Sequence, residues 1–562
     1  MAELSESVPS NTCTAFHDVE LIEEVRHFFS RLSTSDEHER EQALDEVCAS
    51  LLDLAISGSA VGEFNGHIGS GPKYVDERTQ SYLLTAMRYR QTCPYKDVRN
   101  KMSSLLKLLQ KEHNIPIPRQ QNEGATSFIP HKEFKQTGNH NDDQVQQMYI
   151  EQFIQTSRLD HVTQVIGLHP KYLNAFQRTH NFMLRGDGPL SYDYRHYIAV
   201  LAAARHRCAY VVRLQEKEFL CQGGDPKWLE SVNNIPQKLK DLYEVIKILA
   251  HQPWLITKEH IAKLLKGKDS WSLSELVHAI VIMAHFSALA SFVFGCGINQ
   301  EVDMEGGYTV QPTSVSENGS DSTDDSSSNG LSNDTQLSEA TVDELMSRMK
   351  KINEQEEEEL SQEEKVKKFE NIGKQNIDLP QPSKEVCMTK VDVTQYVIEP
   401  EFTYTDFVKR GEIGSNTTFR AQDYAWEDHG YSLVNRLYPD IGPLLDEKFS
   451  IAKDLTYNTM GNKQEVDTSL LRQVIWIYIH SLFGIRHDDY DYGSVNQLME
   501  RSLKTYIKIV TCYPERTTKK DYDNFWRVFK HSEKVHVNIM ILEARMQAEL
   551  LYSLRAIMQY MT

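Results

Sequence analysis

The chain has 562 residues, of which 40% are hydrophobic and 25% are charged, so it is long enough for several domains with a sizeable core. Its formal net charge of -19 argues against a general nucleic-acid-binding protein, because contacts with phosphate need clustered Lys and Arg side chains. An acidic surface favours solubility instead.

The first residues of the chain are polar and acidic and contain no long apolar run, so they predict no secretory signal. The eight cysteines include no close CxxC pair, which indicates reduced thiols and not a disulfide framework or a zinc site. We therefore expect a protein without a metal or cofactor. Its expected location is the cytoplasm, with the nucleus as a second compartment.

One apolar run, Leu276–Ile298, is long enough to cross a membrane. It contains His278, His285 and two serines, which are costly in a lipid bilayer. We therefore predict a buried core helix here and do not expect an integral membrane protein.

In chain order, residues 1–69 form an N-terminal extension that is partly helical, with amphipathic candidates at Asp18–Leu32 and Glu39–Ile56. From 70 to 300 the sequence reads as consecutive helices joined by turns that carry Pro or Gly, such as PYKD, GDGPLS and GGDPKW. Few stretches alternate with a period of two, so this region predicts an all-α domain.

Residues 301–388 change abruptly, first to SENGSDSTDDSSSNGLSND and then to the charged run KINEQEEEELSQEEKVKKFE. This composition offers too little apolar surface to offset the entropy lost on ordering, so we predict a disordered acidic linker. A transient helix at Thr341–Phe369 is compatible with the pattern.

Residues 389–562 predict a second all-α domain. Its strongest helix candidates are Leu433–Tyr457, Ser469–Phe483, Ser494–Val510 and Thr517–Tyr560.

The stretch Thr517–Tyr560 contains no Gly or Pro, and Thr518 precedes Asp521 as an N-terminal capping residue does. It predicts one long helix or two consecutive ones. Glu533 lies in the middle of an apolar stripe on that helix, made by Trp526, Phe529, Val537 and Met540. A carboxylate that faces a core needs a partner, either a nearby Lys or Arg in a structural ion pair or the cation of a ligand.

The segments Ser274–His285 and Ser469–His480 have the same length between Ser and His and a similar apolar interior. This similarity indicates either a duplication or the ordinary likeness of two apolar helices. Where the first segment has Val277, the second has Arg472, which lies at helical spacing from two isoleucines. The C-terminal half thus has an Arg and a Glu that both point inward.

An Arg fork suits a carboxylate and a Glu accepts hydrogen bonds from an ammonium group, so Arg472 and Glu533 with an apolar wall match a free amino acid with an aliphatic side chain. Burial of that side chain contributes only ~1.5–3 kcal/mol, whereas micromolar binding needs about 8 kcal/mol. The charged contacts must supply much of the difference. Taken alone, the sequence favours the alternative that the two residues bind each other.

Cys208 lies in the helical stretch Leu190–Gln215, directly after Arg205, His206 and Arg207. Positive charge at these three residues lowers the pKa of a neighbouring thiol and favours the reactive thiolate. The alternative is that Cys208 is a small core residue on an apolar helix, which is the commoner role of a helical cysteine.

The stretch Leu190–Gln215 resembles the active helix of the alkylhydroperoxidase-D/carboxymuconolactone-decarboxylase-like fold, an all-α fold whose redox members carry CxxCxxxH. Cys208 matches the first cysteine, but Val211 and Gln215 stand at the second cysteine and the histidine.

The chain as a whole resembles the sestrin family over roughly residues 70–300 and 390–562. The motifs that carry this resemblance are AAARHRCAY, GGDPKWL, PWLITKEHI, FGCGI, AQDYAWEDHGYSLVNRLYPD, LTYNTM, RHDDYDYG, KHSEKVHVN and LEARMQAELLY. The implied fold is two all-α halves of the alkylhydroperoxidase-like type joined by the linker.

For sestrins, the C-terminal half binds free leucine, and the leucine-free protein binds and inhibits the GATOR subcomplex that promotes activation of the TOR kinase complex. The resemblance therefore implies a stress-responsive leucine sensor and negative regulator of TOR signalling, which leucine releases from GATOR.

The resemblance also implies roles for single residues. Glu533 would hold the leucine amine and Arg472 its carboxylate, which reverses the preference for an ion pair between them. The side chain would contact Leu471, Trp526 and Phe529. A latch over the ligand would be formed by Thr456, Tyr457, Thr459 and Thr468.

Two further pairs of residues match surfaces that sestrins use to contact GATOR. Asp488 and Asp489 belong to RHDDYDYG, although by themselves they indicate only a solvated loop. Trp271 and Ser272 match a second contact region.

An enzyme remains the alternative function. Sestrins with alkyl hydroperoxide reductase activity use a Cys, a Tyr two residues later and a His seven residues after the Cys. The chain has Cys208 and Tyr210 but Gln215 in place of the His, and glutamine cannot act as a general base. The proton relay is then incomplete unless His206 substitutes. A third alternative is a scaffold with neither activity.

Overall fold

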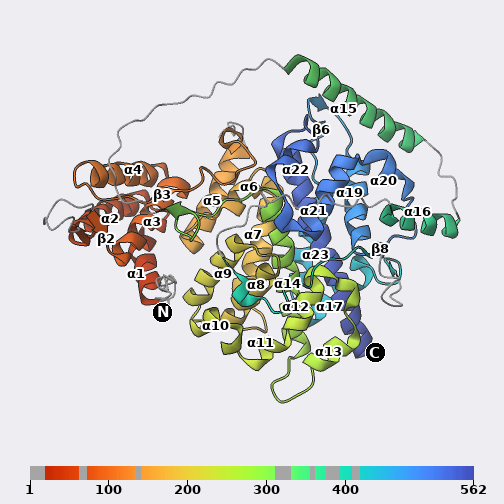
Figure 1. The fold of residues 1–562 in the computed structure, drawn as a ribbon, viewed down its shortest axis with the longest axis horizontal. Coiled ribbons are helices and arrows are strands. Elements are labelled where there is room, and N and C mark those ends of the chain that lie inside the picture. The colour runs from red at the N-terminus through yellow and green to blue at the C-terminus, as the bar shows by residue number, and fades with distance from the viewer. Residues whose placement is uncertain are drawn as a thin grey trace, which may run out of the picture.

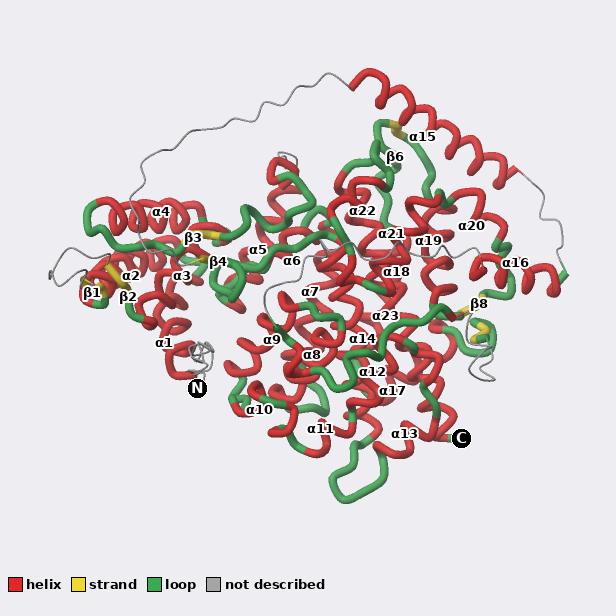
Figure 2. The backbone as a smooth tube through the Cα atoms, in the orientation of Figure 1, coloured by secondary structure: helices red, strands yellow, loops and turns green. Residues whose placement is uncertain are grey.

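The structure, a computed structural model, describes residues 19–61, 73–134, 141–309, 331–354, 361–374, 392–407 and 418–562. Nearly all regular structure in these ranges is helical (Figure 2), which confirms the all-α prediction. The strands in these ranges form only short two-stranded pairs. They are β1 Ser59–Val61 with β2 Lys73–Val75, β3 Arg119–Gln120 with β4 Tyr308–Thr309, β5 Phe419–Arg420 with β8 Ile485–Arg486, and β6 Thr459–Met460 with β7 Lys463–Gln464.

The helices of the N-terminal half are α1 Val19–Ser30, α2 Glu37–Ser57, α3 Glu77–Thr92, α4 Lys96–Lys111, α5 Asn141–Thr156, α6 His161–Ile166, α7 Pro170–Arg185, α8 Tyr192–Arg205, α9 Ala209–Cys221, α10 Lys227–Glu230, α11 Gln237–Asp241, α12 Tyr243–His251, α13 Lys258–Leu264 and α14 Leu273–Gly295. Those that follow are α15 Leu331–Glu354, α16 Gln362–Lys374, α17 Tyr431–Leu437, α18 Ile441–Asp454, α19 Ser469–Leu482, α20 Gly493–Leu498, α21 Arg501–Cys512, α22 Lys519–Asn524 and α23 His531–Met561.

Helices α1–α4 form an N-terminal subdomain with its own hydrophobic core, which includes Phe29, Leu51 and Tyr89. Figure 1 shows them as the red and orange group at one end of the molecule. Their starts are fixed by local chemistry, since Asp36 caps α2 and Asp76 caps α3 by accepting hydrogen bonds from backbone N–H groups. The domain boundary expected at 69/70 falls among residues 62–72, outside the described residues.

A second core fills the rest of the molecule, and α14 and α23 pack together at its centre (Figure 1). Ser272 and Glu275 form a capping box that starts α14. This helix alone among the described ones is long and apolar enough to cross a membrane, yet its apolar window is completely buried by protein. The prediction of a core helix at this position is therefore confirmed. Because the core draws residues from both halves, the two halves form one packed body.

The segment expected to be a linker contains two helices. Val342, Leu345 and Met349 of α15 are buried, as are Phe369 and Ile372 of α16. Both helices contact α20 (Figure 1). Residues 310–330, 355–360 and 375–391 of the segment lie outside the described residues.

The stretch expected to be helical from Thr517 to Tyr560 is two helices, α22 and α23, separated by the non-helical residues 525–530. Thr518 caps α22 in a capping box with Asp521, as predicted. Trp526 has a φ of 44°, in the left-handed region that ends regular helix. The prediction that Trp526 and Phe529 lie on one helix face with Val537 was therefore wrong, although all three reach the same cavity.

Candidate functional site

A cavity of about 50 Å³ lies where α19, α23, the segment after α18 and the β6–β7 hairpin meet. All nine residues that the sequence resemblance assigns to ligand binding line it, and six further residues complete the lining. The nine are Thr456, Tyr457, Thr459, Thr468, Leu471, Arg472, Trp526, Phe529 and Glu533. The six are His169, Leu455, Ile475, His536, Val537 and Met540.

Glu533 lies in the first turn of α23, where free backbone N–H groups and the helix dipole favour a carboxylate. It accepts hydrogen bonds from the backbone N–H of Lys530 at 2.8 Å and of Gly461 at 3.1 Å. The Thr459 hydroxyl donates a third, at 3.2 Å. Gly461 has a φ of +60° at the tip of the hairpin, so a glycine suits this turn. The carboxylate is thus fixed by the hairpin and by its own helix.

Arg472 lies in the first turn of α19 and is 9% exposed. Its guanidinium donates to the Lys453 carbonyl at 2.7 Å and to the Thr468 hydroxyl at 3.2 Å. Burial lowers the pKa of Arg472 below its ordinary value. Within the part of the chain that the structure describes, Arg472 and Glu533 form no ion pair with each other or with any other side chain. The contacts of the described residues therefore do not support the alternative that Arg472 and Glu533 neutralise each other.

Apolar side chains form the wall between the two charged groups. Trp526 and Phe529 stack with ring centroids 4.1 Å apart and an interplanar angle of 17°. Leu471 is buried at the base, beside Ile475, Val537 and Met540. A surface of this kind accepts a branched aliphatic side chain.

Tyr457 and three threonines form the outer side of the cavity. Tyr457 is 49% exposed, although it lines the cavity. The hydroxyls of Thr456 and Thr468 lie 3.4 Å apart and join the segment before β6 to the start of α19. Tyr457 and the three threonines therefore lie on the side of the cavity where the predicted latch would cover a ligand.

Two histidines of the lining were missed by sequence reasoning. His169 ends the loop before α7, in the N-terminal half, and its Nε2 lies 2.8 Å from the Ser532 carbonyl. His536 of α23 donates from Nε2 to the Ala452 carbonyl at 2.8 Å. Burial lowers the pKa of His169 to about 3 and that of His536 to about 4, so both rings are neutral near pH 7. The LHPKY sequence signals a helix start at His169 but not its approach to the C-terminal half.

This arrangement has the chemistry of an amino-acid site. A carboxylate at a helix N-terminus can receive an ammonium group, a guanidinium can hold a carboxylate, and the wall between them is apolar. The neutral histidines add polar atoms without adding charge.

Asp488 and Asp489 differ in their surroundings. Asp488 is 1% exposed and accepts from Nε of Arg420 and Nε of Arg486, each at 2.8 Å, next to the β5–β8 pair. Asp489 is exposed. Of the two residues expected at the partner surface, Asp489 is the one that a partner can reach.

Trp271 is 3% exposed, and its Nε1 donates to the Lys238 carbonyl at 3.0 Å. Ser272 is exposed, but its hydroxyl is engaged as the N-terminal cap of α14. In this second predicted contact region, only Ser272 lies at the surface.

Cys208 is buried at the start of α9, and burial raises the pKa of its thiol to about 12. Arg205 donates to the carbonyls of Ile398 and Phe402, so its charge does not serve the thiol. The expectation that neighbouring cations lower the pKa of the Cys208 thiol was wrong, because burial outweighs them.

The residues expected to assist Cys208 have other contacts. Tyr210 donates to Glu301 at 3.1 Å, and Gln215 accepts from Nδ1 of His196 at 2.8 Å. His206 is buried beside Ser287 and Arg545, with Nε2 2.9 Å from the Ser287 hydroxyl. Burial and the Arg545 charge hold the pKa of His206 well below its ordinary value, so the ring is neutral.

Comparison with known proteins adds a consistent result. Residues 124–561 match the family model described as PA26 p53-induced protein (sestrin). Sestrin-1 of Xenopus laevis is 50% identical over 461 residues, which cover 80% of this chain and 95% of the relative. Sestrin-2 of Homo sapiens is 50% identical over 445 residues (78% and 91%), and Sestrin-3 of Mus musculus is 48% identical over 474 residues (81% and 96%).

Proposed function

The chain belongs to the sestrin family, and on that premise we propose that it is an intracellular leucine sensor that restrains TOR complex signalling. The observation that carries the proposal is the pair of charged groups in the 50 Å³ cavity. Arg472 and Glu533 are held by neutral donors and acceptors, so within the described residues no counter-ion occupies the place of a charged ligand group.

Leucine suits this cavity in one orientation. Its ammonium group faces Glu533, its carboxylate faces Arg472, and its isobutyl group packs on Trp526 and Phe529. Burial of that group contributes ~1.5–3 kcal/mol. Hydrogen bonds that involve charged groups contribute about 1.5–3 kcal/mol each. Together these terms reach the range of micromolar affinity, about 8 kcal/mol.

We further propose that the leucine-free form binds and inhibits the GATOR subcomplex and that leucine releases it. Helix α19 supports this coupling, because Arg472 lies in its first turn and its last turn leads through Gly484 to β8 and Asp489. A ligand that shifts α19 can thereby alter the loop that carries Asp489. Such coupling is reciprocal, so GATOR must also weaken leucine binding.

Calorimetric titration of leucine into the purified chain tests the site. The test variants are Glu533→Gln and Arg472→Met, which keep most of the side-chain volume and remove one charge each. Glu447→Gln, at an exposed position of α18, is the matched control. We expect saturable binding by the wild type and the control, and affinity lower by about tenfold or more in each test variant.

Absence of leucine binding to a folded wild-type chain would reject the proposal, as would test variants that bind like the control. For the coupled step, GATOR captured on immobilised chain should be released by leucine from the wild type and retained by Glu533→Gln. The alternative of a hydroperoxide reductase is disfavoured by the burial of Cys208 and by the engagement of Gln215 with His196.

A further inference from the structure

A second and larger cavity, of about 460 Å³, lies between the N-terminal subdomain and α9. Helices α1 and α3 form one side, and α9, residues 156–158 and the segment after α14 form the other. Cavities of about 300–1,000 Å³ at the junction of two packed units are the usual sites of small ligands. None of its lining residues belongs to the leucine cavity.

One side of this cavity is apolar. Val25 and Phe29 of α1 and Leu84 of α3 are buried in the N-terminal core and face the cavity. Leu21 and Ile22 extend the same surface toward the rim, where Arg26 and Glu77 are exposed. The cavity therefore has an apolar wall that starts at the surface and runs inward.

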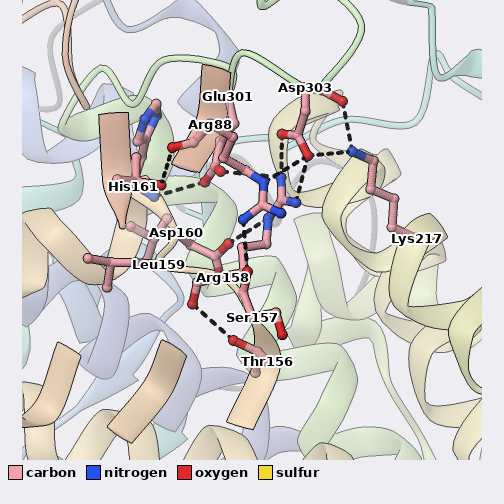
Figure 3. Close-up of polar contacts among 12 residues, drawn as sticks. Arg88, Thr156, Ser157, Arg158, Leu159, Asp160, His161, Lys217, Glu301 and Asp303 are labelled. Carbon is pink, nitrogen blue, oxygen red and sulfur yellow. Dashed lines mark hydrogen bonds and ion pairs between the residues drawn. The ribbon is translucent and has the colours of Figure 1, made fainter. Parts of the chain in front are cut away.

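The opposite end is cationic. Arg88, Arg158 and Lys217 converge on the single carboxylate of Asp303, with nitrogen to Oδ2 distances of 3.1, 2.9 and 3.2 Å (Figure 3). Three neighbouring cations hold the pKa of Asp303 well below its usual range, although its burial acts in the opposite direction. All four residues line the cavity.

The charges at this end do not cancel. Besides Asp303, Glu301 forms an ion pair with Arg158 at 3.2 Å. Glu218 also lines the cavity, but Arg185 pairs with it at 2.6 Å, so two carboxylates are left to face the three cations. Asp160 also lies beside Arg158, at 3.1 Å, but burial raises its pKa to about 7. An excess of positive charge of up to one unit is left near the Lys217 ammonium and the Arg88 guanidinium.

Donors remain for a ligand at the same place. The Lys217 ammonium has three N–H groups, and its contacts within the described residues are the carbonyl and carboxylate of Asp303. Arg88 donates from Nε to Asp303 and from Nη1 to the Ser157 carbonyl, and its Nη2 makes no hydrogen bond in that part of the chain. A cationic ligand would meet repulsion here, and a wholly apolar one would leave these donors unused.

We propose that this cavity binds a single-chain amphiphile with a carboxylate head, the chemistry of a free fatty acid. The hydrocarbon chain lies along α1 and α3, and the carboxylate accepts hydrogen bonds from Lys217 and Arg88. The site is independent of leucine binding, since it shares no residue with the leucine cavity.

Titration of the full chain with sodium decanoate tests the proposal, with octanoate and decyltrimethylammonium as comparison ligands. Decanoate should bind with one-to-one stoichiometry and about tenfold more tightly than octanoate, because two more methylene groups are buried. Decyltrimethylammonium, which has the same chain and the opposite charge, should not saturate the site.

Two pairs of variants locate the binding. Ser81→Trp fills the cavity from α3 and should abolish decanoate binding, whereas Ser104→Trp, at an exposed position of α4 with the same local hydrogen bond, should not. Lys217→Met removes the ammonium group and should weaken decanoate binding by about tenfold or more. Lys263→Met, on the surface of α13, is its control.

The proposal is overturned if decanoate does not bind to the folded wild-type chain, if it binds equally well to folded Ser81→Trp, or if the cationic amphiphile binds as tightly. If Ser81→Trp does not fold, Lys217→Met decides the question through the ratio of decanoate to decyltrimethylammonium affinity. Leucine titration of the same samples should be unchanged, which separates this site from the proposed leucine site.

Discussion

The imidazole of His169 accepts a hydrogen bond from the hydroxyl of Tyr457, with Nδ1 and Oη 3.1 Å apart. The direction follows from the other ring nitrogen, since Nε2 faces the Ser532 carbonyl and must donate to it when the ring is neutral. A residue of the N-terminal half thus holds Tyr457 on the outer side of the cavity around Arg472 and Glu533.

His169→Phe should therefore weaken leucine binding. It retains an aromatic ring against Tyr457, whose centroid lies 5.6 Å away, but removes both hydrogen bonds. We expect a dissociation constant about fivefold to tenfold higher, with most of the change in the dissociation rate. Stopped-flow intrinsic tryptophan fluorescence, to which Trp526 of the cavity contributes, measures that rate. Tyr457→Phe should have a smaller effect, and an unchanged rate in His169→Phe would exclude this role.

The buried pair Lys448 and Glu543 should be sensitive to loss of one partner. The two side chains are completely buried with Nζ and Oε1 3.0 Å apart, and Tyr172 also donates to this carboxylate. Glu543→Gln leaves the Lys448 ammonium without a counter-charge, so we expect a loss of about 3–5 kcal/mol in the free energy of unfolding in urea. The double variant Lys448→Met, Glu543→Gln should recover most of that loss. A double variant no more stable than the single one would contradict this account.

Stability should fall as the pH is lowered from about 6.5 toward 4. Burial lowers the pKa of His278 to about 3, and the pKa values of His169, His180 and His251 are likewise about 3. Between these values and the ordinary pKa of 6.5, the unfolded chain binds more protons than the folded one, so acid favours unfolding. Each such histidine adds about 1.4 kcal/mol per pH unit to the slope.

The variant His278→Gln isolates one of these contributions. It keeps a donor for the Met183 carbonyl, which His278 now contacts at 2.9 Å, and removes the titrating group. The slope of unfolding free energy against pH should decrease by about 1.4 kcal/mol per pH unit. An identical slope in wild type and variant would show that His278 is protonated in both states.

Cys208 should resist alkylation in the native chain. Its buried thiol, with a pKa raised to about 12, supplies almost no thiolate at pH 8. Iodoacetamide labelling followed by peptide mass spectrometry should show slow modification of Cys208 in buffer and rapid modification in urea. Rapid labelling of the folded chain would restore the thiol peroxidase as a serious alternative.

Asp488 and Asp489, the acidic pair after β8, should differ in their roles. Substitution of Asp488 should affect stability, and substitution of Asp489 should affect partner binding. Asp488→Asn removes the charge that two arginines share and should lower the thermal midpoint. Asp489→Asn should leave that midpoint unchanged and weaken capture of GATOR in the absence of leucine. If Asp488→Asn abolished capture of GATOR and Asp489→Asn did not, Asp489 would be excluded as the contact.

The sequence predicted the helical class, because amphipathic spacing and capping residues are local signals. The resemblance to sestrins, and not these local signals, indicated most of the residues that line the cavity around Arg472 and Glu533. The sequence placed Trp526 and Phe529 on a helix, however, since the left-handed backbone at Trp526 leaves no trace in a hydrophobic pattern. His169 was missed for a different reason. Its contact with Ser532 spans 363 residues of sequence, and no periodicity reports a contact of that range.

Charge was harder to interpret than hydrophobicity. Adjacent aspartates suggested a solvated loop, but Arg420 and Arg486 enclose Asp488. Arg205, three residues before Cys208 in sequence, donates to the carbonyls of Ile398 and Phe402. In each case at least one contact joins residues far apart in the chain, Arg420 with Asp488 and Arg205 with Ile398.

The shared core of α14 and α23 also bears on how the chain acquires its structure. Arg545 of α23 donates to the Ala250 carbonyl, 295 residues earlier in the sequence, and to Ser291 of α14. Contacts of such range form slowly, whereas the helices of the N-terminal subdomain contact near neighbours and can assemble early. Until α23 arrives, the face of α14 that packs against it has no cover, and exposed apolar surface of this kind makes a partly assembled chain a substrate for chaperones. Neither half can then be transplanted as an independent module, for instance into a fluorescent biosensor.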